Sequence, residues 1–279
     1  MSAEAPPAPV LPAAELERRF GGLERLYGVA GAARIRAAHV AVIGIGGVGS
    51  WAAEALARSG VGQITLVDMD HVAESNVNRQ IHALTDTVGQ AKVLAMRDRI
   101  AQINPACTVH CVDDFATPEN WPSLLPHPVD AVVDACDQVK AKTAIAAWAR
   151  DESVLHITVG AAGGKRHAHK VDIDDLALTT HDPLLAQLRY RMRKQHGAPR
   201  EGKKIGTICV FSREAVAGPD ASCNIDGDGD GSLNCHGYGS VVAVTATFGQ
   251  CAAGWVLDQL AAGFKKPHKR RYNLRLCSS

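Results

Sequence analysis

Short apolar runs recur along the chain and alternate with longer segments in which apolar and polar residues mix. A short run bounded by glycine or polar residues is typical of a buried strand, and a longer segment with a repeat near 3.6 residues is typical of a helix. The pattern predicts strands near residues 39–44, 63–68, 108–112, 130–134, 154–160 and 207–211. It predicts helices near residues 48–59, 89–103, 139–150, 182–196 and 238–262. Strands and helices that alternate in this way form a mostly parallel α/β sheet.

Residues 1–14 stand outside this pattern because they are rich in alanine and proline and have no apolar period. They also lack the basic start and the apolar block of a secretion signal. No linker rich in glycine and serine divides the rest of the chain. The sequence therefore predicts a loose tail followed by a single domain over residues 15–279, and a cytoplasmic location.

The segment at residues 241–264 is apolar enough to raise the question of a membrane span. Thr245, Gln250 and Asp258 interrupt it, whereas a spanning helix is almost uniformly apolar. A domain of this size also needs a buried central helix. We interpret the segment as that helix and expect no membrane insertion.

Four glycines, Gly44, Gly46, Gly47 and Gly49, follow the first predicted strand and lead into a helix. Glycine lets the main chain approach an anionic ligand, and the free N–H groups at a helix start favour negative charge. The same glycines would also serve as turn and cap residues without any ligand. Between a strand and a helix, however, they predict a phosphate site in a Rossmann-like first half.

Charged residues beyond the glycine loop separate ATP from a dinucleotide. Asp68 ends the second predicted strand, where an acid commonly binds a ribose hydroxyl in either ligand. Arg79 and Lys92 follow, and such cations stabilise the charge that builds on a leaving pyrophosphate. Asp137 comes after the strand at residues 130–134, and one carboxylate plus phosphate oxygens suits Mg²⁺. Together these residues favour ATP with Mg²⁺.

The formal net charge of +1 conceals two basic clusters. The first comprises Arg189, Arg191, Arg193, Lys194, Arg200, Lys203 and Lys204, interrupted by one acid, Glu201. The second comprises Lys265, Lys266, Lys269, Arg270, Arg271 and Arg275, without any acid. Such runs are often simply solvated faces. In a chain whose remainder is acidic they also fit contact with an RNA backbone, which makes binding sensitive to salt.

The eight cysteines are scattered, and no two have CxxC spacing. We therefore expect no zinc and, without an export signal, reduced thiols. The acidic segment at residues 226–231 is similar to the start of a calcium loop. It has Gly237 where a bidentate Glu is needed, so we predict no calcium site.

The motifs occur in an order that resembles a known family. GIGGVG, DMD, SNVNRQ, GQAK and DACDQ follow one another as in the adenylating domains of the ubiquitin-activating superfamily, which includes the ThiF, MoeB and HesA proteins. Segments away from the glycine loop discriminate better among the members of this superfamily. RFGGLERLYG, RQIHAL, INPAC, VDDF, VFSREA and VTATFG resemble the bacterial tRNA threonylcarbamoyladenosine dehydratases. The resemblance extends from about residue 15 to about residue 263.

This resemblance implies ATP-dependent dehydration of threonylcarbamoyladenosine beside the anticodon of tRNA. The threonyl carboxylate would be adenylated, and a ureido nitrogen of the same side chain would then close a hydantoin ring without an enzyme nucleophile. The resemblance assigns to ATP the residues Gly44, Gly46, Gly47, Gly49, Asp68, Asp70, Asn76, Arg79, Gln80 and Lys92. Asp137 would hold Mg²⁺, and Arg79, Lys92 and Asp137 form the expected catalytic set.

The resemblance also implies a homodimer with a nucleotide-binding half at about residues 30–160 and a substrate and dimer half at about residues 161–279. The family's sheet adds antiparallel strands in this second half. In MoeB-like dimers an N-terminal arginine reaches the partner's ATP, and Arg25 or Arg19 is the candidate here. RFGG replaces the family's RYxRQ at this point, which leaves the choice open. A monovalent cation, K⁺ or Na⁺, and a cysteine desulfurase system are further candidate requirements.

Two other functions stay open on the sequence. A sulfur-carrier adenylyltransferase of the MoeB or ThiF type would activate a protein ending in Gly-Gly, and the absence of CxxC pairs disfavours it weakly. An NAD-binding oxidoreductase is disfavoured by Arg79 and Lys92.

Cys235 lies where the family often has a cysteine and could act in a thiol relay, but we interpret it as a spectator. We place Cys209 in the core.

Overall fold

The computed structural model describes residues 12–200, 202–220, 222 and 238–264. Its α-helices are α1 (Ala13–Ala37), α2 (Gly49–Arg58), α3 (Lys92–Ile103), α4 (Val139–Glu152), α5 (Pro183–Gln195) and α7 (Val242–Ala262). Its strands are β1 (His39–Ile43), β2 (Gln63–Val67), β3 (Thr108–Val112), β4 (Ala131–Asp134), β5 (Leu155–Val159), β6 (Val171–Asp175) and β7 (Ile208–Ser212). The described residues also form the short 3₁₀ helices η1 (Glu74–Asn76), η2 (Thr85–Thr87) and η3 (Ala168–Lys170).

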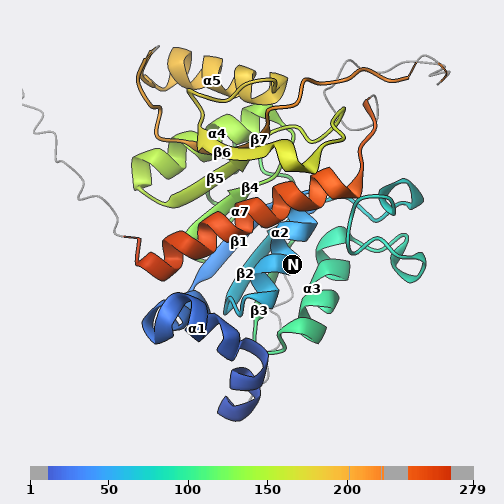
Figure 1. The fold of residues 1–279 in the computed structure, drawn as a ribbon, viewed down its shortest axis with the longest axis vertical. Coiled ribbons are helices and arrows are strands. Elements are labelled where there is room, and N and C mark those ends of the chain that lie inside the picture. Colours follow the sequence, from blue (N-terminus) through green and yellow to red (C-terminus); the bar gives the residue numbers. More distant parts are fainter. Residues whose placement is uncertain (1–11, 201, 221, 223–237, 265–279) are drawn as a thin grey trace, which may run out of the picture.

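The seven strands of the described residues form one sheet in the order β3-β2-β1-β4-β5-β7-β6 (Figure 1). Neighbouring strands are parallel except β6 and β7, which are antiparallel. The predicted α/β class, the mostly parallel sheet and the antiparallel addition in the second half are therefore confirmed. The chain builds outward from β1 to β3 and then crosses to β4 on the other side of β1. In such sheets the ligand crevice lies at this reversal, beyond the carboxyl ends of the two central strands.

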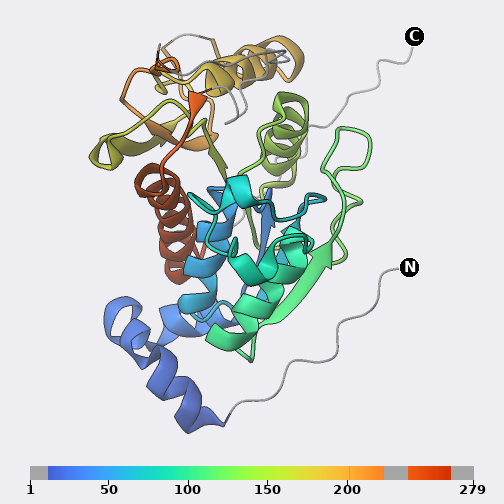
Figure 2. The same ribbon diagram turned by 90° about the vertical axis from the view of Figure 1, so that its right-hand side faces the viewer.

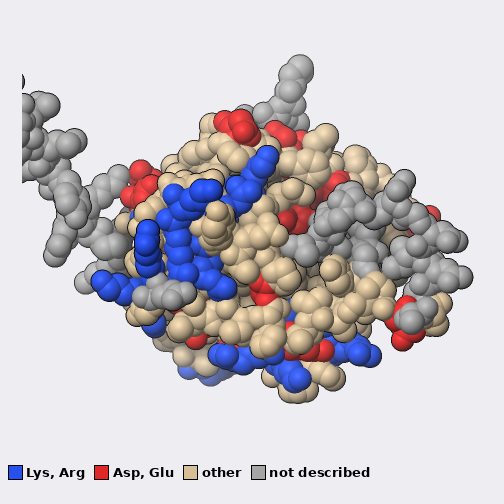
Figure 3. Space-filling view, turned by 90° about the horizontal axis from the view of Figure 1, so that it is seen from above, with Lys and Arg blue, Asp and Glu red and all other residues tan. Residues whose placement is uncertain are grey.

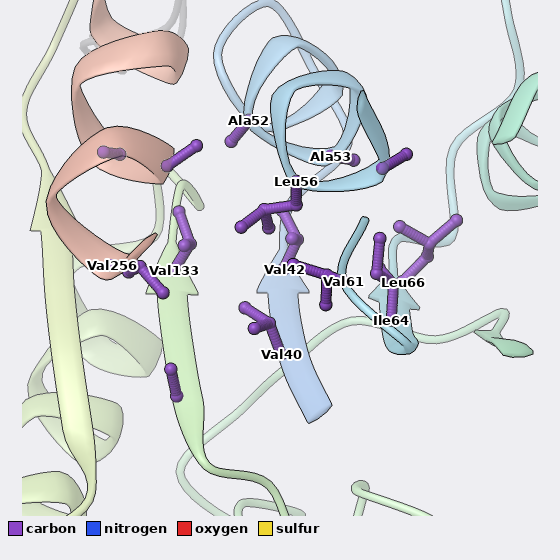
Figure 4. Packing of buried hydrophobic residues seen from close by; sticks show 14 of the residues in the cluster. Val40, Val42, Ala52, Ala53, Leu56, Val61, Ile64, Leu66, Val133 and Val256 are labelled. Carbon is purple, nitrogen blue, oxygen red and sulfur yellow. The ribbon is translucent and has the colours of Figure 1, made fainter. Parts of the chain in front are cut away.

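Helices cover both faces of the sheet. Apolar side chains of α2, α3 and α7 pack on one face, and Figure 4 shows Val40, Val42 and Ile64 beneath α2. On the other face, α4 and the segment between β3 and β4 form a cluster that includes Trp121 and Ile145. Figure 2 shows this segment on the side of the sheet opposite to α7. Helix α5 packs mainly on α4 and extends the second layer.

The long apolar segment forms α7, which lies diagonally across the sheet and against α2 (Figure 1). The contact between the two helices is very close at Gly249, where an added Cβ would lie only 2.4 Å from the main-chain oxygen of Val48. Only glycine fits this crossing. None of the helices in the described part of the chain has the length and apolarity needed to cross a bilayer.

Two elements differ from the sequence predictions. Helix α1 begins at Ala13, so the helix takes in the last two residues that we assigned to the tail. Pro12 is the N-cap residue of this helix, and alanine, which follows it, has the highest helix propensity. Strand β6 has no counterpart among the predicted strands. Its sequence, VDIDD, carries three acids instead of an apolar run, because it pairs only with β7 at the edge of the sheet.

Candidate active site

The glycine loop is closely packed beneath and open above. Gly44 has a positive φ of 85° and donates its N–H to the main-chain oxygen of Val67 at 2.8 Å. An added Cβ at Gly49 would lie 1.7 Å from the oxygen of Gly44, so a larger residue would break the turn. A Cβ at Gly46, in contrast, would meet no described heavy atom within 4 Å. The loop therefore leaves room for a ligand directly over its main chain.

Asp68 holds this loop against the end of β2. Its Oδ2 accepts the N–H of Ile45 at 2.6 Å, and its Oδ1 accepts the N–H of Asp70 at 2.9 Å. Burial raises the pKa of Asp68, although the nearby Lys92 opposes that shift. The acid that we expected at the ribose thus shapes the glycine loop, an interaction that residue spacing could not reveal.

Lys92 lies at the same edge, at the first residue of α3. Its Nζ is 2.7 Å from Oδ2 of Asp70 and 4.0 Å from Oδ1 of Asp68. The Lys92 side chain is only 7% exposed, whereas that of Asp70 is 54% exposed. The structure thus brings three predicted site residues together as one partly accessible cluster, and Asp70 is the direct partner of Lys92.

Arg79 lies over the glycine loop. Its Cγ would be 3.4 Å from a Cβ added at Gly47, and its main-chain oxygen accepts a hydrogen bond from the indole N–H of Trp51 at 2.9 Å. The guanidinium donates from Nη1 to the oxygen of Ser75 at 2.6 Å and to Asn78 Oδ1 at 2.9 Å. No described residue forms a hydrogen bond with the other guanidinium nitrogens, so they are available to an anion.

Asn76 and Gln80 complete the segment between β2 and α3. The side-chain oxygen of Asn76 accepts the N–H of Ala73 at 3.1 Å and so stabilises the short helix η1. Gln80 is buried, and its Oε1 has no hydrogen-bond partner among the described residues. A buried amide oxygen without a partner is costly, so Gln80 retains an acceptor that a ligand or water would satisfy.

A buried network beneath β4 was not predicted from the sequence. Lys142 Nζ lies 3.0 Å from Asp134 Oδ1, and both side chains are fully buried. Thr158 donates its hydroxyl to Asp134 Oδ2 at 2.7 Å, and the Cys136 thiol donates to Oδ1 at 2.9 Å. Burial acts against both charges, but their mutual attraction prevails and leaves the pKa of Asp134 lowered and that of Lys142 raised. This network fixes the carboxyl end of β4.

Asp137 follows this fixed strand end and is exposed. Among the hydrogen bonds of the described residues, its carboxylate receives only a long one, 3.4 Å, from the amide of Gln138. The described residues contain no group of three or more His, Cys, Asp or Glu side chains that could hold a metal. A cation at Asp137 would therefore need ligands from a bound nucleotide and water.

The two candidate arginines of α1 differ in their contacts. Arg19 pairs with Glu15 at 2.8 Å and donates to the main-chain oxygen of Ile103 at 3.1 Å. Arg25 is exposed, and none of the described residues forms a hydrogen bond or ion pair with it. Arg19 is therefore held within its own chain, while Arg25 is free to bind another group.

The described cysteines show no sign of an activated thiol. Burial raises the pKa of Cys107 to about 12 and that of Cys111 to about 11. The pKa values of Cys136 and Cys209 are raised well above the usual value, and Cys209 is a fully buried core residue, as predicted. A thiolate nucleophile among these residues is disfavoured. Cys235 and the acidic segment at residues 226–231 lie outside the described residues.

Comparisons with known proteins show the family of this chain. Residues 19–276 match the ThiF family model. The tRNA threonylcarbamoyladenosine dehydratase of Escherichia coli is 45% identical over 88% of this chain and 94% of its own. The enzyme of the same name from Haemophilus influenzae is 43% identical over 88% and 94% of the two chains. This chain belongs to the ThiF family.

A solved structure extends the similarity to three dimensions. The crystal structure of the E. coli dehydratase in complex with ATP superposes with a TM-score of 0.81 at 43% identity, over 91% of this chain and 98% of that one. At such coverage, the family of tRNA threonylcarbamoyladenosine dehydratases within ThiF is the one to which this chain belongs. The resemblance stated from the motifs is thereby confirmed.

Proposed function

We propose that this protein uses ATP to dehydrate threonylcarbamoyladenosine in tRNA to its cyclic form. The observation that carries the proposal is the open space over Gly46, in a chain similar over nearly its whole length to a dehydratase solved with ATP. The threonyl carboxylate attacks the α-phosphorus of ATP, and pyrophosphate leaves. A ureido nitrogen then attacks the acyl carbon, loses its proton to solvent, and expels AMP together with one carboxylate oxygen.

The second step needs little chemical help because nucleophile and electrophile belong to one side chain. The first step needs stabilisation of the charge on the departing pyrophosphate, and fixed cations supply it. We assign this role to Arg79, over the glycine loop, and to Lys92, which exchanges Asp70 for a phosphate oxygen. Gly44, Gly46, Gly47 and Gly49 let the phosphates approach the main chain. Asp68 receives a ribose hydroxyl, and Asn76 and Gln80 border the phosphates.

Mg²⁺ accompanies ATP in this proposal, and the exposed carboxylate of Asp137 would hold it. The fit rests on the few contacts that Asp137 makes and on its place beside the fixed end of β4. When bound, Mg²⁺ would neutralise charge on the phosphates. No zinc is proposed, and a requirement for K⁺ or Na⁺ stays a prediction.

A homodimer is the second part of the proposal. Arg25 would reach the nucleotide of the partner subunit, because its guanidinium has no partner within the described chain whereas Arg19 is engaged. The nucleotide half at about residues 30–160 and the substrate half at about residues 161–279 would then cooperate across the interface. A cysteine desulfurase system stays a further candidate partner.

Nucleoside mass spectrometry after incubation of purified protein with modified tRNA tests this function directly. With ATP and Mg²⁺ we expect threonylcarbamoyladenosine to lose the elements of one water molecule, with formation of AMP and pyrophosphate. Reactions with NAD in place of ATP, or without nucleotide, serve as controls. The proposal fails if the nucleoside is unchanged while a protein ending in Gly-Gly is adenylated, or if NAD alone supports a reaction.

A further inference from the structure

One helix of the second half, α5, exposes an aromatic ring among cations. Tyr190 is 61% exposed, and Lys194 Nζ lies over its ring at 5.4 Å from the centroid. The two residues are one helical turn apart and so share a face of α5. The opposite face of the helix carries the buried residues Leu184, Leu185, Leu188 and Met192. These residues attach the helix to the core. The Tyr190 ring is not needed for packing.

The charged side chains of this helix are all cationic. Helix α5 contains no Asp or Glu, and among its basic residues Arg191 and Lys194 are not tied to a main-chain oxygen of the described chain. Arg189 and Arg193 differ, because Arg189 donates to the oxygens of Leu176 and Thr179 and Arg193 to that of Pro199. Arg200, Lys203 and Lys204 follow and are exposed. Figure 3, which views the molecule from the α5 side, shows lysine and arginine gathered in a band on this face.

The same face begins at the sheet edge that carries the glycine loop. A hollow of about 270 Å³ lies between the start of α5 and residues 215–216, and Ala186 lines it one turn before Tyr190. Its wall at Asp182 contacts the end of β5, since the carboxylate accepts the N–H of Ala161 at 2.9 Å. Strand β5 runs parallel to β4 and next to it. A chain that crossed Tyr190 toward the hollow would therefore approach the edge where the nucleotide site lies.

We infer that Tyr190 is a stacking platform for an unpaired base of the tRNA anticodon loop, with Arg191 and Lys194 binding the adjoining phosphates. An exposed ring flanked by cations is the combination that binds single-stranded RNA, because every base has a face to stack and every nucleotide has a phosphate. A second copy of this chain fits the face poorly, since two cationic strips would repel each other across a twofold axis. The inference rests on the proposed tRNA substrate and names the surface that receives it.

Filter binding of an anticodon stem-loop RNA tests the platform. Tyr190→Ala should weaken binding by about fivefold or more, the scale of one lost base stack, and leave the salt dependence unchanged. Tyr190→Phe keeps the ring and should bind like the wild type. The paired substitution Arg191→Ala with Lys194→Ala should instead flatten the salt dependence by about one unit per cation, because these two residues bind the adjoining phosphates.

A fully paired RNA duplex as competitor sharpens the test, because its bases cannot stack on a side chain. The wild type should prefer the stem-loop, and Tyr190→Ala should lose much of that preference. In turnover, Tyr190→Ala should raise KM and leave kcat near the wild-type value, since the ring does not touch the reacting atoms. Light scattering monitors the oligomeric state of each variant.

Three outcomes would overturn the inference. Equal stem-loop affinity of Tyr190→Ala and wild type would exclude a stacking role. Dissociation of the dimer in Tyr190→Ala would assign the ring to contact between protein copies. If the wild type binds no tRNA and forms no cyclic nucleoside, the proposed function falls together with the platform, whereas intact wild-type activity with an inert Tyr190 removes the platform alone.

Discussion

Two buried lysines pair with aspartates in this protein, and their surroundings differ. Lys142 and Asp134 lie beneath β4 with both side chains fully buried, and Thr158 satisfies the second oxygen of the carboxylate. Lys92 is almost as deeply buried, but its partner Asp70 is half exposed at the sheet edge. We call the first the interior pair and the second the edge pair. Both pairs consist of a lysine and an aspartate, and the distance between nitrogen and oxygen is similar, 3.0 Å in the interior pair and 2.7 Å in the edge pair.

The difference in exposure decides what each pair can do. A phosphate cannot reach the interior pair, so its charges serve only each other and the strand that they fix. Asp70 is already solvated, so a phosphate can replace the Asp70 carboxylate beside Lys92 at little cost in free energy. Removal of one partner from a buried pair costs far more than from an accessible one. The interior pair should therefore control stability, and the edge pair should control chemistry.

The largest expected effect is on the interior pair. Lys142→Met leaves the Asp134 carboxylate buried without its cation and should lower the free energy of unfolding by about 3–5 kcal/mol. Lys140→Met, at an exposed position on the same helix, is the control and should change it by about 0.5 kcal/mol or less. Urea unfolding measures both. A loss below about 1 kcal/mol in Lys142→Met would contradict the distinction between the pairs.

Lys92→Met tests the edge pair, and here we expect activity to change more than stability. Turnover should fall by about a hundredfold to a thousandfold, the scale of losing one fixed charge at a transition state. The free energy of unfolding should fall less than in Lys142→Met, because Asp70 is solvated and Asp68 keeps its two N–H donors. Arg97→Met lies on the same helix and should leave turnover unchanged. Normal turnover in Lys92→Met would remove this lysine from the catalytic set.

Asp137→Asn tests a third residue of this sheet edge, whose carboxylate we propose to hold Mg²⁺. We expect turnover to fall by about a hundredfold, with a higher Mg²⁺ concentration needed for half-maximal rate. Asp151→Asn, at the exposed far end of α4, is the matched control. Unchanged Mg²⁺ dependence in Asp137→Asn would place the metal elsewhere.

Acid should destabilise both regions, because each contains a buried histidine. The pKa of His82, near Lys92, and that of His156, near Asp134, are lowered to about 4, mainly by burial. The unfolded chain binds these protons near pH 6.5, so stability is lost as pH falls from about 6.5 toward 4. From pH 6.5 to 5.5 each histidine should contribute about 1 kcal/mol of loss. His82→Leu should reduce the loss by that amount, and an unchanged pH profile would exclude this origin.

The smallest effect is expected at Cys235. Ring closure within the tRNA side chain needs no covalent enzyme intermediate, and burial raises the pKa values of the described thiols of Cys107, Cys111 and Cys136. Cys235→Ala should therefore keep most of its dehydratase activity. An inactive but folded Cys235→Ala, together with a thioester trapped in the wild type, would replace this mechanism with a thiol relay.

Sequence periodicity was sufficient for most of the fold but not for its polar interior. The first four strands were predicted to within a residue or two, because buried parallel strands are short apolar runs. Strand β6 was missed because an edge strand can carry acids such as Asp172 and Asp174. Helix α1 was missed as well, since glycine at Gly28, where its φ is 72°, interrupts the helical pattern with a kink.

The candidate site was predicted as a set of residues, but their contacts were not. Spacing brought Asp68, Lys92 and Arg79 to one edge, since Asp68 follows β2, Lys92 begins α3 and Arg79 lies in the segment between them. It could not reveal that Asp68 binds the N–H of Ile45, because main-chain partners depend on how the loop folds. The interior pair was invisible for another reason. A lysine within a helix is usually predicted to be exposed. Only the packing of α4 against β4 and β5 shows that Lys142 is buried.

The glycine crossing between α7 and α2 has a consequence for the order in which the chain acquires function. The glycine loop leads into α2, whose outer side stays uncovered until Gly249 packs on it. About 200 residues of synthesis separate the two, which takes on the order of ten to forty seconds on a ribosome. We therefore expect the emerging chain to bind ATP only once α7 has left the ribosome.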